Sequence, residues 1–501
     1  MASTVLLKNG TLLIHDADDH VVPTKADLLI SGNTITRIAP DIPTAHVGEV
    51  IDCTDKIVTP GFIDGHQHVW QTQLKGRHAD ELFLDYMPSG NFQSSNFTLS
   101  DFYWGQLGGC LELLNAGTTT VLDHAHMITS PEVAPTALSA TLTSGIRSIF
   151  ALAPINQIAA WQPQLTFSTS PDDSVLAPWV SSTLTTLAAR FNRPASRVTL
   201  GLAFDGWYLP RDACQPLFAA ARAAGIALLT THYVRNATGA AASLPAQLRD
   251  WGLLDAFPSV VFSHACGATE EDLRIMKETR SHFASTPGTE LQMALGRPLC
   301  FDAAAYPAAC VGGDCHSAGG GGSVVHELRL GLQSARGERN QRFLDRGVAP
   351  ARVWRGVEEA FNLGTVKGAR AVGMEGVVGA LREGARADVV VWEGRSPAMV
   401  CAAQQDPVAA VVLHSSPQDV DAVVVDGMVR KRDGKLVEIR VEEDARGIVG
   451  RGTVGWGDVA RELVRSREEL QKRMEGIDFE AAKKVLMKTW YIDESKVVDE
   501  V

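Results

Sequence analysis

Between about residues 57 and 380, apolar β-branched runs alternate with stretches whose apolar residues recur at helical spacing. This alternation is typical of βα units, in which parallel strands are covered by helices. Eight runs are expected to be strands: Ile57–Asp64, Thr118–Asp123, Arg147–Ala153, Val198–Asp205, Ile226–His232, Ser259–His264, His282–Pro287 and Ala308–Asp314. Eight parallel strands close a (β/α)8 barrel, so the sequence predicts an α/β protein built on a TIM barrel.

β-rich segments flank the barrel region on both sides. Short apolar runs separated by turn signals fill the first 58 residues, and Ala409–Leu413 and the hairpin signals Asp426-Gly427 and Asp433-Gly434 follow the barrel. Neither piece has enough strands to bury a face alone, so we predict one small β-sandwich domain made from both. The expected division is 1–58 and 382–440 for the sandwich, 59–381 for the barrel and 441–501 for a helical C-terminal tail on the surface or at a subunit contact.

The composition excludes several classes of protein. With a net charge of −12 and no basic cluster, the chain lacks the positive surface that nucleic acid or an anionic membrane requires. We see no signal peptide and no run long enough to cross a bilayer. The eight cysteines form no CxxC pair, which indicates reduced thiols and a cytoplasmic protein.

Histidines and one aspartate stand at the carboxyl ends of the expected strands, the face where barrel enzymes keep their active sites. In the HQH sequence that ends the first run, the two imidazoles share one face of an extended strand. The residues at strand ends are His66, His68, His124, His126, His232, His264 and Asp314. Imidazole and carboxylate groups gathered in this way predict a metal site.

Several of these features together resemble the amidohydrolase superfamily. They are TPGFIDGHQH, the single histidines that end strands five and six, the aspartate in GGDCHS, and the closing GALREGARADVVVW. The similarity is greatest to the branch of cytosine deaminases, guanine deaminases and triazine chlorohydrolases, and it extends from about Val5 to Leu436.

The resemblance implies a ligand set and a mechanism. The ligands of one divalent metal would be His66, His68, His232 and Asp314, and His264 would face the activated water and the substrate. Two-metal members use a carboxylated lysine, which the inner strands lack here, so we expect one metal per chain, zinc first and iron as the alternative. Such a metal lowers the pKa of water to about 7, and Asp314 and His264 would act as catalytic proton-transfer partners.

The chain departs from this branch at Arg235. Deaminases of this branch carry a glutamate three residues after the strand-five histidine, where this chain has Arg235. A guanidinium cannot transfer protons as that glutamate does. Arg235 is either a loop arginine paired with an acid or an anchor for an anionic substrate group. Glu290 could replace the lost acid or lie on a structural turn.

Other residues near the strand ends are expected to line the substrate pocket. We assign His124 and His126 to a hydrogen-bonding wall, and not to a second metal site, because no further ligand set remains. The aromatic residues could stack on a planar substrate or pack in the core. The expected substrate-binding residues are Trp70, Gln71, Trp104, His124, His126, Tyr208, Tyr233, Arg235 and Glu290.

The sequence therefore predicts a metal-dependent hydrolase that acts on a non-peptide C–N bond of a small cyclic amide, amidine or aminated heterocycle. Hydrolytic dechlorination or ring deamination is the first alternative. A non-hydrolytic reaction, such as decarboxylation, or binding alone is the second. We expect a small-molecule substrate, no nucleic-acid or membrane partner, and a homodimer or higher homo-oligomer.

Overall fold

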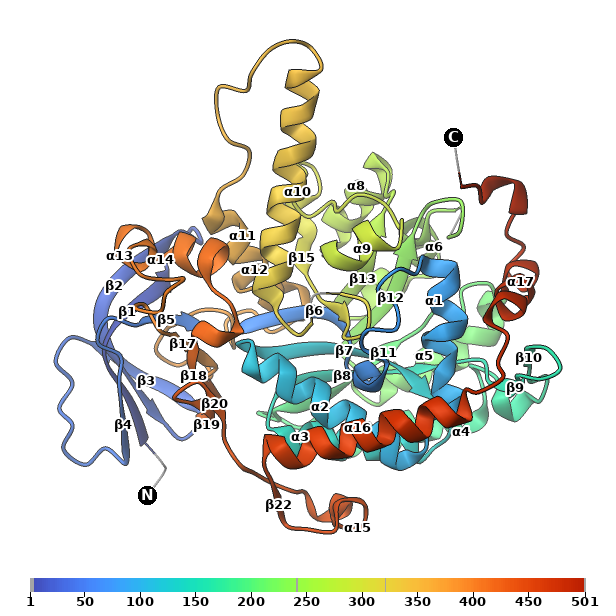
Figure 1. Cartoon of the computed structure of the whole chain (residues 1–501), viewed down its shortest axis with the longest axis horizontal. Helices are drawn as coiled ribbons and strands as arrows, with labels where there is room; N and C mark the ends of the chain where they lie inside the picture. Colours follow the sequence, from blue (N-terminus) through green and yellow to red (C-terminus); the bar gives the residue numbers. More distant parts are fainter. Residues whose placement is uncertain (1–3, 240–241, 320, 500–501) are drawn as a thin grey trace.

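The computed structural model describes residues 4–239, 242–319 and 321–499. A parallel barrel forms the centre of the molecule, a second sheet lies at one side, and the C-terminal helices run along the barrel (Figure 1). The barrel strands are β6 (Phe62–His68), β7 (Thr118–Ile128), β8 (Arg147–Pro154), β11 (Val198–Ala203), β12 (Leu228–Val234), β13 (Ser259–Cys266), β14 (His282–Ser285), β15 (Ala309–Val311) and β16 (Asp314–Cys315). The predicted barrel is confirmed.

The eighth strand is broken in two, and its second half closes the barrel. β15 pairs with β14, whereas β16 pairs with β6, which places Asp314 opposite Gln67. Gly312 and Gly313 lie between the two halves. A Cβ atom on Gly312 would come within 2.6 Å of the backbone nitrogen of His66, so only glycine allows this close approach.

The second sheet unites the two ends of the chain. Its strands are β1 (Thr4–His15), β2 (Val21–Ser31), β3 (Thr34–Ala39), β4 (Glu49–Asp52), β5 (Ile57–Pro60), β17 (Val389–Trp392), β18 (Val420–Val425), β19 (Met428–Arg432) and β20 (Lys435–Leu436). β5 joins the halves by pairing with β1 on one side and β17 on the other. Leu7, Leu28, Val389 and Val424 share its apolar core, which confirms a small β domain made from both ends.

Two expectations about strands need correction. The run Ile57–Asp64 is not one strand, because the chain passes from the small sheet to the barrel at Gly61, where a Cβ atom would collide with Thr119. Ala409–Leu413 is helical and not a strand. The Asp406 carboxylate accepts from the backbone N–H groups of Val408 and Ala409 and starts a helical turn that outweighs the β propensity of the valines.

Helices cover the barrel from outside. A capping box of Thr269 and Asp272 starts α8, and Gly364 ends α11 shortly before α12 begins. The helices and remaining short strands are α1 (Phe83–Ser89), α2 (Leu99–Asn115), α3 (Val133–Ser144), α4 (Pro178–Phe191), α5 (Arg211–Ala223), α6 (Leu244–Asp250), α7 (Leu253–Ala256), α8 (Glu270–Thr279), α9 (Pro287–Gln292), α10 (Val324–Leu344), α11 (Val357–Leu363), α12 (Val366–Ala371), α13 (Ala402–Gln405), α14 (Pro407–Ala409), α15 (Arg446–Val449), α16 (Trp456–Arg473), α17 (Phe479–Thr489), β9 (Ile158–Ala160), β10 (Thr166–Phe167), β21 (Ile439–Arg440) and β22 (Thr453–Val454). Among the described helices, none combines the length and the apolar character that a membrane span requires.

The C-terminal tail is helical and packs on the barrel. α16 lies against α2, and α17 lies against α1 (Figure 1). Arg473 pairs with Asp101 at 2.7 Å. Leu486 and Met487 of α17 join an apolar cluster that includes Cys266, the last residue of β13. The tail therefore reaches the carboxyl end of the barrel strands.

The two sheets are held together by a buried arginine, which allows a test of the interface. Arg147 in β8 donates from Nε to Asp388 at 2.7 Å and from Nη2 to Asp426 at 2.8 Å. We expect Arg147→Ala to lower the free energy of unfolding by about 3–5 kcal/mol, because it leaves a buried carboxylate without its partner.

Urea denaturation measures this change in stability. The exposed pair of Arg190 and Asp444 is the matched control, and Arg190→Ala should cost at most about 1 kcal/mol. Equal effects of the two substitutions would contradict this view of the interface.

Candidate active site

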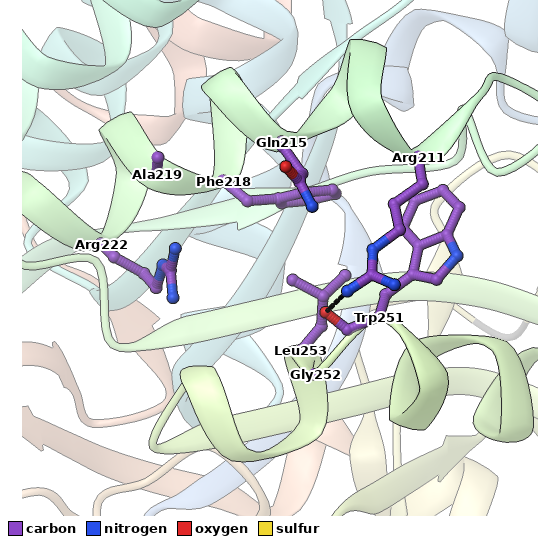
Figure 2. A pocket seen from close by; sticks show the side chains of 8 residues that line it. All are labelled: Arg211, Gln215, Phe218, Ala219, Arg222, Trp251, Gly252 and Leu253. Carbon is purple, nitrogen blue, oxygen red and sulfur yellow. Dashed lines mark hydrogen bonds between the residues drawn. The ribbon is translucent and has the colours of Figure 1, made fainter.

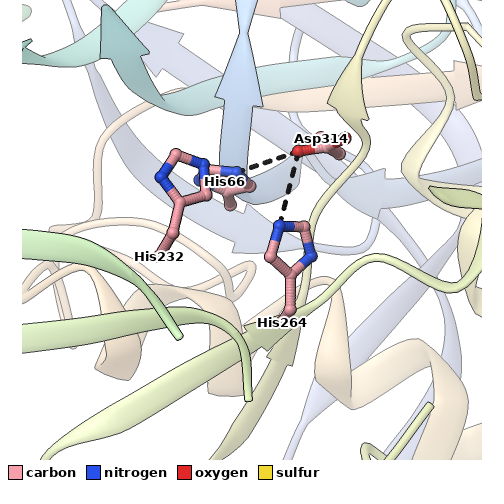
Figure 3. Close-up of side chains that lie close together, drawn as sticks. All are labelled: His66, His232, His264 and Asp314. Atoms are coloured by element: carbon pink, nitrogen blue, oxygen red, sulfur yellow. Dashed lines mark hydrogen bonds and ion pairs between the residues drawn. The ribbon is translucent and has the colours of Figure 1, made fainter. Parts of the chain in front are cut away.

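Four histidines and one aspartate converge at the carboxyl ends of the barrel strands. Figure 3 shows His66 of β6, His232 of β12, His264 of β13 and Asp314 of β16, whose ligand atoms all lie within 4.8 Å of one another. Asp314 Oδ1 lies 3.1 Å from His66 Nε2, 3.5 Å from His68 Nε2 and 3.8 Å from His264 Nε2. The structure thus brings together every expected metal ligand and the expected catalytic histidine.

The other nitrogen of each imidazole is held by the protein. A ring whose Nδ1 donates a hydrogen bond keeps its lone pair on Nε2, the atom that faces Asp314 here. His68 Nδ1 donates to a backbone carbonyl, so its tautomer is defined by the geometry. The Nδ1 contacts are His66 with Ser263 Oγ at 2.8 Å, His68 with the carbonyl of His124 at 2.7 Å, His232 with Asp205 Oδ2 at 2.9 Å and His264 with Thr286 Oγ1 at 2.8 Å.

The charges of the cluster suit a divalent cation. Burial lowers the pKa of His66 and His68 well below the ordinary value and that of His264 to about 4, so these rings are neutral at pH 7. Burial acts to raise the pKa of Asp314, but the neighbouring imidazoles, His264 first, hold it below its ordinary value. Neutral imidazoles around an ionised carboxylate are the donor set that Zn²⁺ and Fe²⁺ prefer.

The backbone is strained at both expected catalytic residues. His264 has a φ of 72° and Asp314 a φ of 63°, in the left-handed region that residues other than glycine avoid. Each such conformation costs about 1–3 kcal/mol, so the surrounding structure must enforce it. Strain of this kind concentrates at active sites.

Three of the expected pocket residues border the cluster. The imidazole of His126 packs against that of His68 at an interplanar angle of 32°, with 3.6 Å between ring centroids, and its Nδ1 accepts from Trp70 Nε1 at 3.1 Å. The ring of His124 lies 4.3 Å from that of His232. The side chains of His124 and His126 in β7 therefore lie against the expected metal ligands, and their contact with a substrate stays a prediction.

Gln71 and Glu290 make their hydrogen bonds to residues outside the cluster, although Glu290 Oε1 lies 3.8 Å from His264 Nδ1. Gln71 donates to Tyr86 and accepts from Ser317. The buried Glu290 accepts from Ser285 and from the backbone N–H of Thr286, and burial raises its pKa to about 8. Within the described residues, no hydrogen bond or ring contact joins the buried Trp104 or the 67% exposed Tyr208 to the cluster.

Arg235 lies beside an acid of the protein. Its Nη1 is 3.7 Å from Asp272 Oδ2, which also accepts from the hydroxyl of Tyr233 at 3.0 Å. Tyr233 near the end of β12 and Arg235 just after it therefore both have their side chains at Asp272. The structure thus favours the ion-paired arginine and brings neither residue to the cluster.

Sequence reasoning missed Asp205. It is the second residue after β11, in LGLAFD, at the carboxyl end of the strand where other strands carry their site residues. Although burial acts to raise the pKa of this carboxyl, the imidazoles of His232 and His124 hold it well below its ordinary value. The strand-end rule that selected the histidines could have found Asp205 as well.

A groove on the outside of the barrel is a separate feature. Figure 2 shows this groove of 210 Å³ between α5 and α7, lined by Arg211, Phe218, Arg222 and Trp251 among others. None of its lining residues belongs to the histidine cluster, so it is not the active site.

Comparison with known proteins identifies the family. The sequence profile of the amidohydrolase family matches residues 57–155 and 309–430. The chain belongs to the amidohydrolase family. It is a hydrolase of carbon–nitrogen bonds other than peptide bonds. Its relatives by sequence include deaminases, and a triazine chlorohydrolase is among the solved structures that share its fold.

The sequence relatives match most of the chain, and solved structures share its fold. This amidohydrolase is 25% identical to a 5'-deoxyadenosine deaminase of Methanobrevibacter smithii over 88% of its own chain and 95% of the relative. It is 26% identical to a 5-methylthioadenosine/S-adenosylhomocysteine deaminase of Moorella thermoacetica over 79% and 86%. A zinc complex of the atrazine chlorohydrolase of Arthrobacter aurescens TC1 aligns with a TM-score of 0.74 at 18% identity, over 93% of this chain and 100% of that one.

The proposed ligand set predicts a pattern of metal loss. His66→Ala, His68→Ala, His232→Ala and Asp314→Asn should each lower the metal content, because three ligands leave an incomplete sphere. His264→Ala should keep its metal. Elemental analysis of protein purified without chelator measures this, with His316→Gln, a buried histidine paired with Glu112, as the control. A metal-free His264→Ala variant, or two metals in the unaltered protein, would contradict the assignment.

The position of Arg235 predicts that its removal has little effect on catalysis. Because the guanidinium is 35% exposed and paired with Asp272, we expect Arg235→Ala to change kcat and KM by no more than about twofold. Steady-state kinetics test this. A KM increase equivalent to about 1.5–3 kcal/mol for a carboxylate-bearing substrate would instead show an anion anchor.

Proposed function

We propose that this amidohydrolase removes an amino group from a small nitrogen heterocycle by hydrolysis, using one zinc ion held by His66, His68, His232 and Asp314. The observation that supports this most directly is the position of the Nε2 atoms. Those of His66 and His68 lie 3.1 and 3.5 Å from Asp314 Oδ1, and that of His232 lies 3.2 Å from His68 Nε2. Each of the three histidine ligands has its Nδ1 occupied by another group of the protein. This arrangement leaves the lone pairs of Nε2 for a cation.

The bound metal supplies one chemical capability, a water whose pKa is lowered to about 7 and which therefore provides hydroxide at neutral pH. Side chains of the protein carry out the proton transfers and stabilise the charge that develops. The Asp314 carboxylate, ionised at pH 7, accepts the proton of the attacking water and returns it to the departing amine.

His264 stabilises the oxygen that becomes negative during attack. Its ring is neutral, and when the Thr286 hydroxyl donates to Nδ1 the hydrogen resides on Nε2, the atom that faces Asp314. The Glu290 carboxyl accepts from the backbone N–H of Thr286 at 2.7 Å and so fixes the residue that orients His264. An N–H group aimed at a developing oxyanion contributes about 2.7–4 kcal/mol in comparable sites.

The relatives support an aminated heterocycle as substrate. Those of similar length are deaminases of 5'-deoxyadenosine, 5-methylthioadenosine and S-adenosylhomocysteine. Zinc is supported by the chlorohydrolase complex and by an adenosine deaminase structure from Xanthomonas campestris with bound zinc, which aligns with a TM-score of 0.72 at 16% identity over 93% of this chain and 99% of that one.

Hydrolytic dechlorination is the second candidate, and the position of Arg235 favours it. Chloride leaves as a weak base and needs no proton, whereas an amine does. The residue at the position of the missing glutamate pairs with Asp272, so it provides no acid for the ring nitrogen.

A substrate panel separates these reactions. The zinc-loaded protein would be incubated with 5'-deoxyadenosine, 5-methylthioadenosine, an amino-triazine and a chloro-triazine, with ammonia and chloride release measured in parallel. We expect ammonia from at least one aminated compound, and a loss of about 10²-fold or more in His264→Ala, which should retain its metal. Chloride release alone would support the second candidate. Neither product from the metal-loaded protein with any compound would overturn both.

A further inference from the structure

Asp205 makes four contacts, and three of them involve His232 or its neighbour Thr231. Its Oδ1 accepts from the backbone N–H of His232 at 2.9 Å and from Thr231 Oγ1 at 3.0 Å. Its Oδ2 lies 2.9 Å from His232 Nδ1 and 3.1 Å from His124 Nε2. Both oxygens are thus engaged by the protein, although the side chain is 42% exposed.

These contacts define the direction and the tautomer of the His232 ring. A carboxylate only accepts, so the hydrogen of a neutral His232 resides on Nδ1 and its lone pair on Nε2. That Nε2 lies 3.2 Å from His68 Nε2, at the centre of the cluster. Trp207 Nε1 donates to Thr231 Oγ1 at 2.6 Å and so holds one of the donors to Asp205.

His124 links the same carboxylate to a second expected ligand. Its backbone carbonyl accepts from His68 Nδ1 at 2.7 Å, while its ring faces Asp205. One residue of β7 therefore supports His68 through its main chain and His232 through Asp205. This double contact gives the strand-two histidine a role that needs no metal of its own.

We propose that Asp205 is a positioning residue for the metal site, which fixes the tautomer and ring direction of His232 and is itself held by His124 and Thr231. The inference rests on the proposed function, since it requires His232 to be a ligand. Carboxylates that hold metal-ligating histidines in this way commonly change metal affinity by about 10- to 100-fold when they are removed.

The same three side chains allow a competing arrangement. The ligand atoms of His124, Asp205 and His232 also lie within 4.8 Å of one another, close enough to hold a second cation. Such a site would require His232 Nδ1 to lose its hydrogen while Nε2 binds the first metal. The measured stoichiometry separates this arrangement from the positioning role.

The deciding variant is Asp205→Asn. The new amide can meet His232 Nδ1 with an N–H group, which would move the imidazole hydrogen to Nε2 and remove the lone pair from the metal centre. Zinc dissociation constants would be measured by competition with a chromogenic chelator, and the visible spectrum of the Co²⁺-loaded protein would report the ligand geometry. Asp212→Asn, an exposed carboxylate of α5, is the matched control.

We expect Asp205→Asn to bind zinc about 10- to 100-fold more weakly and to alter the cobalt spectrum, with an unchanged melting temperature of the metal-free protein. Asp205→Glu should recover part of the affinity, and His124→Ala, which keeps the carbonyl contact with His68, should lose less than Asp205→Asn.

Three outcomes would overturn the proposal. Unchanged affinity and spectrum in Asp205→Asn, with one tight metal in the unaltered protein, would overturn the positioning role alone. Two metals in the unaltered protein and one in the variant would establish the second cation site in its place. An unaltered protein that binds no zinc would overturn the proposed function together with this inference.

Discussion

The site depends on the closure of the barrel between its first and last strands. β16 is only two residues long, yet its pairing with β6 brings Asp314 beside the histidines that stand some 250 residues earlier in the chain. The buried Asp64 carboxyl secures this junction, since its Oδ1 accepts from the backbone N–H of both His66 and Gly313. The two glycines before Asp314 permit the approach because any side chain at Gly312 would overlap the backbone of His66.

The electrostatics of the cluster follow from this enclosure. Rings packed at centroid distances of 4.7 Å between His66 and His68, and 5.0 Å between His66 and His232, would repel one another if all were protonated. Burial prevents that by disfavouring the charged form of His66 and His68. His232 is the exception: burial acts to lower its pKa, but the Asp205 carboxylate more than offsets this and raises it. A cation at the centre would therefore compete with a proton at His232 in particular.

Features of the fold and the site that follow from local sequence pattern could be predicted. Those that depend on contacts between residues far apart in the sequence could not. Strand ends carrying histidines were recognisable, because parallel strands present their carboxyl ends at one face whatever the details of packing. Asp205 was missed because an aspartate after a strand is also a common turn residue, and only the three-dimensional contact with His232 distinguishes the two roles. The role of Arg235 could not be decided from sequence, because its partner Asp272 lies 37 residues later, in the capping box of α8. The helical turn at Ala410–His414 was wrongly predicted as a strand. In the sequence the valines are the more conspicuous signal, whereas in the structure the cap provided by Asp406 decides the conformation.

The pairing of β5 with β17 has a consequence for synthesis on the ribosome. Pro60 pairs with Val389, so about 330 further residues must be synthesised before this edge of β5 can pair with its neighbour. At about 5–20 residues per second the delay is roughly 15–65 s. During that interval the N-terminal half of the small sheet exposes a strand edge and part of its apolar core to other nascent chains. The growing polypeptide therefore passes through an aggregation-prone stage, in which chaperone binding to the first 60 residues would be most useful.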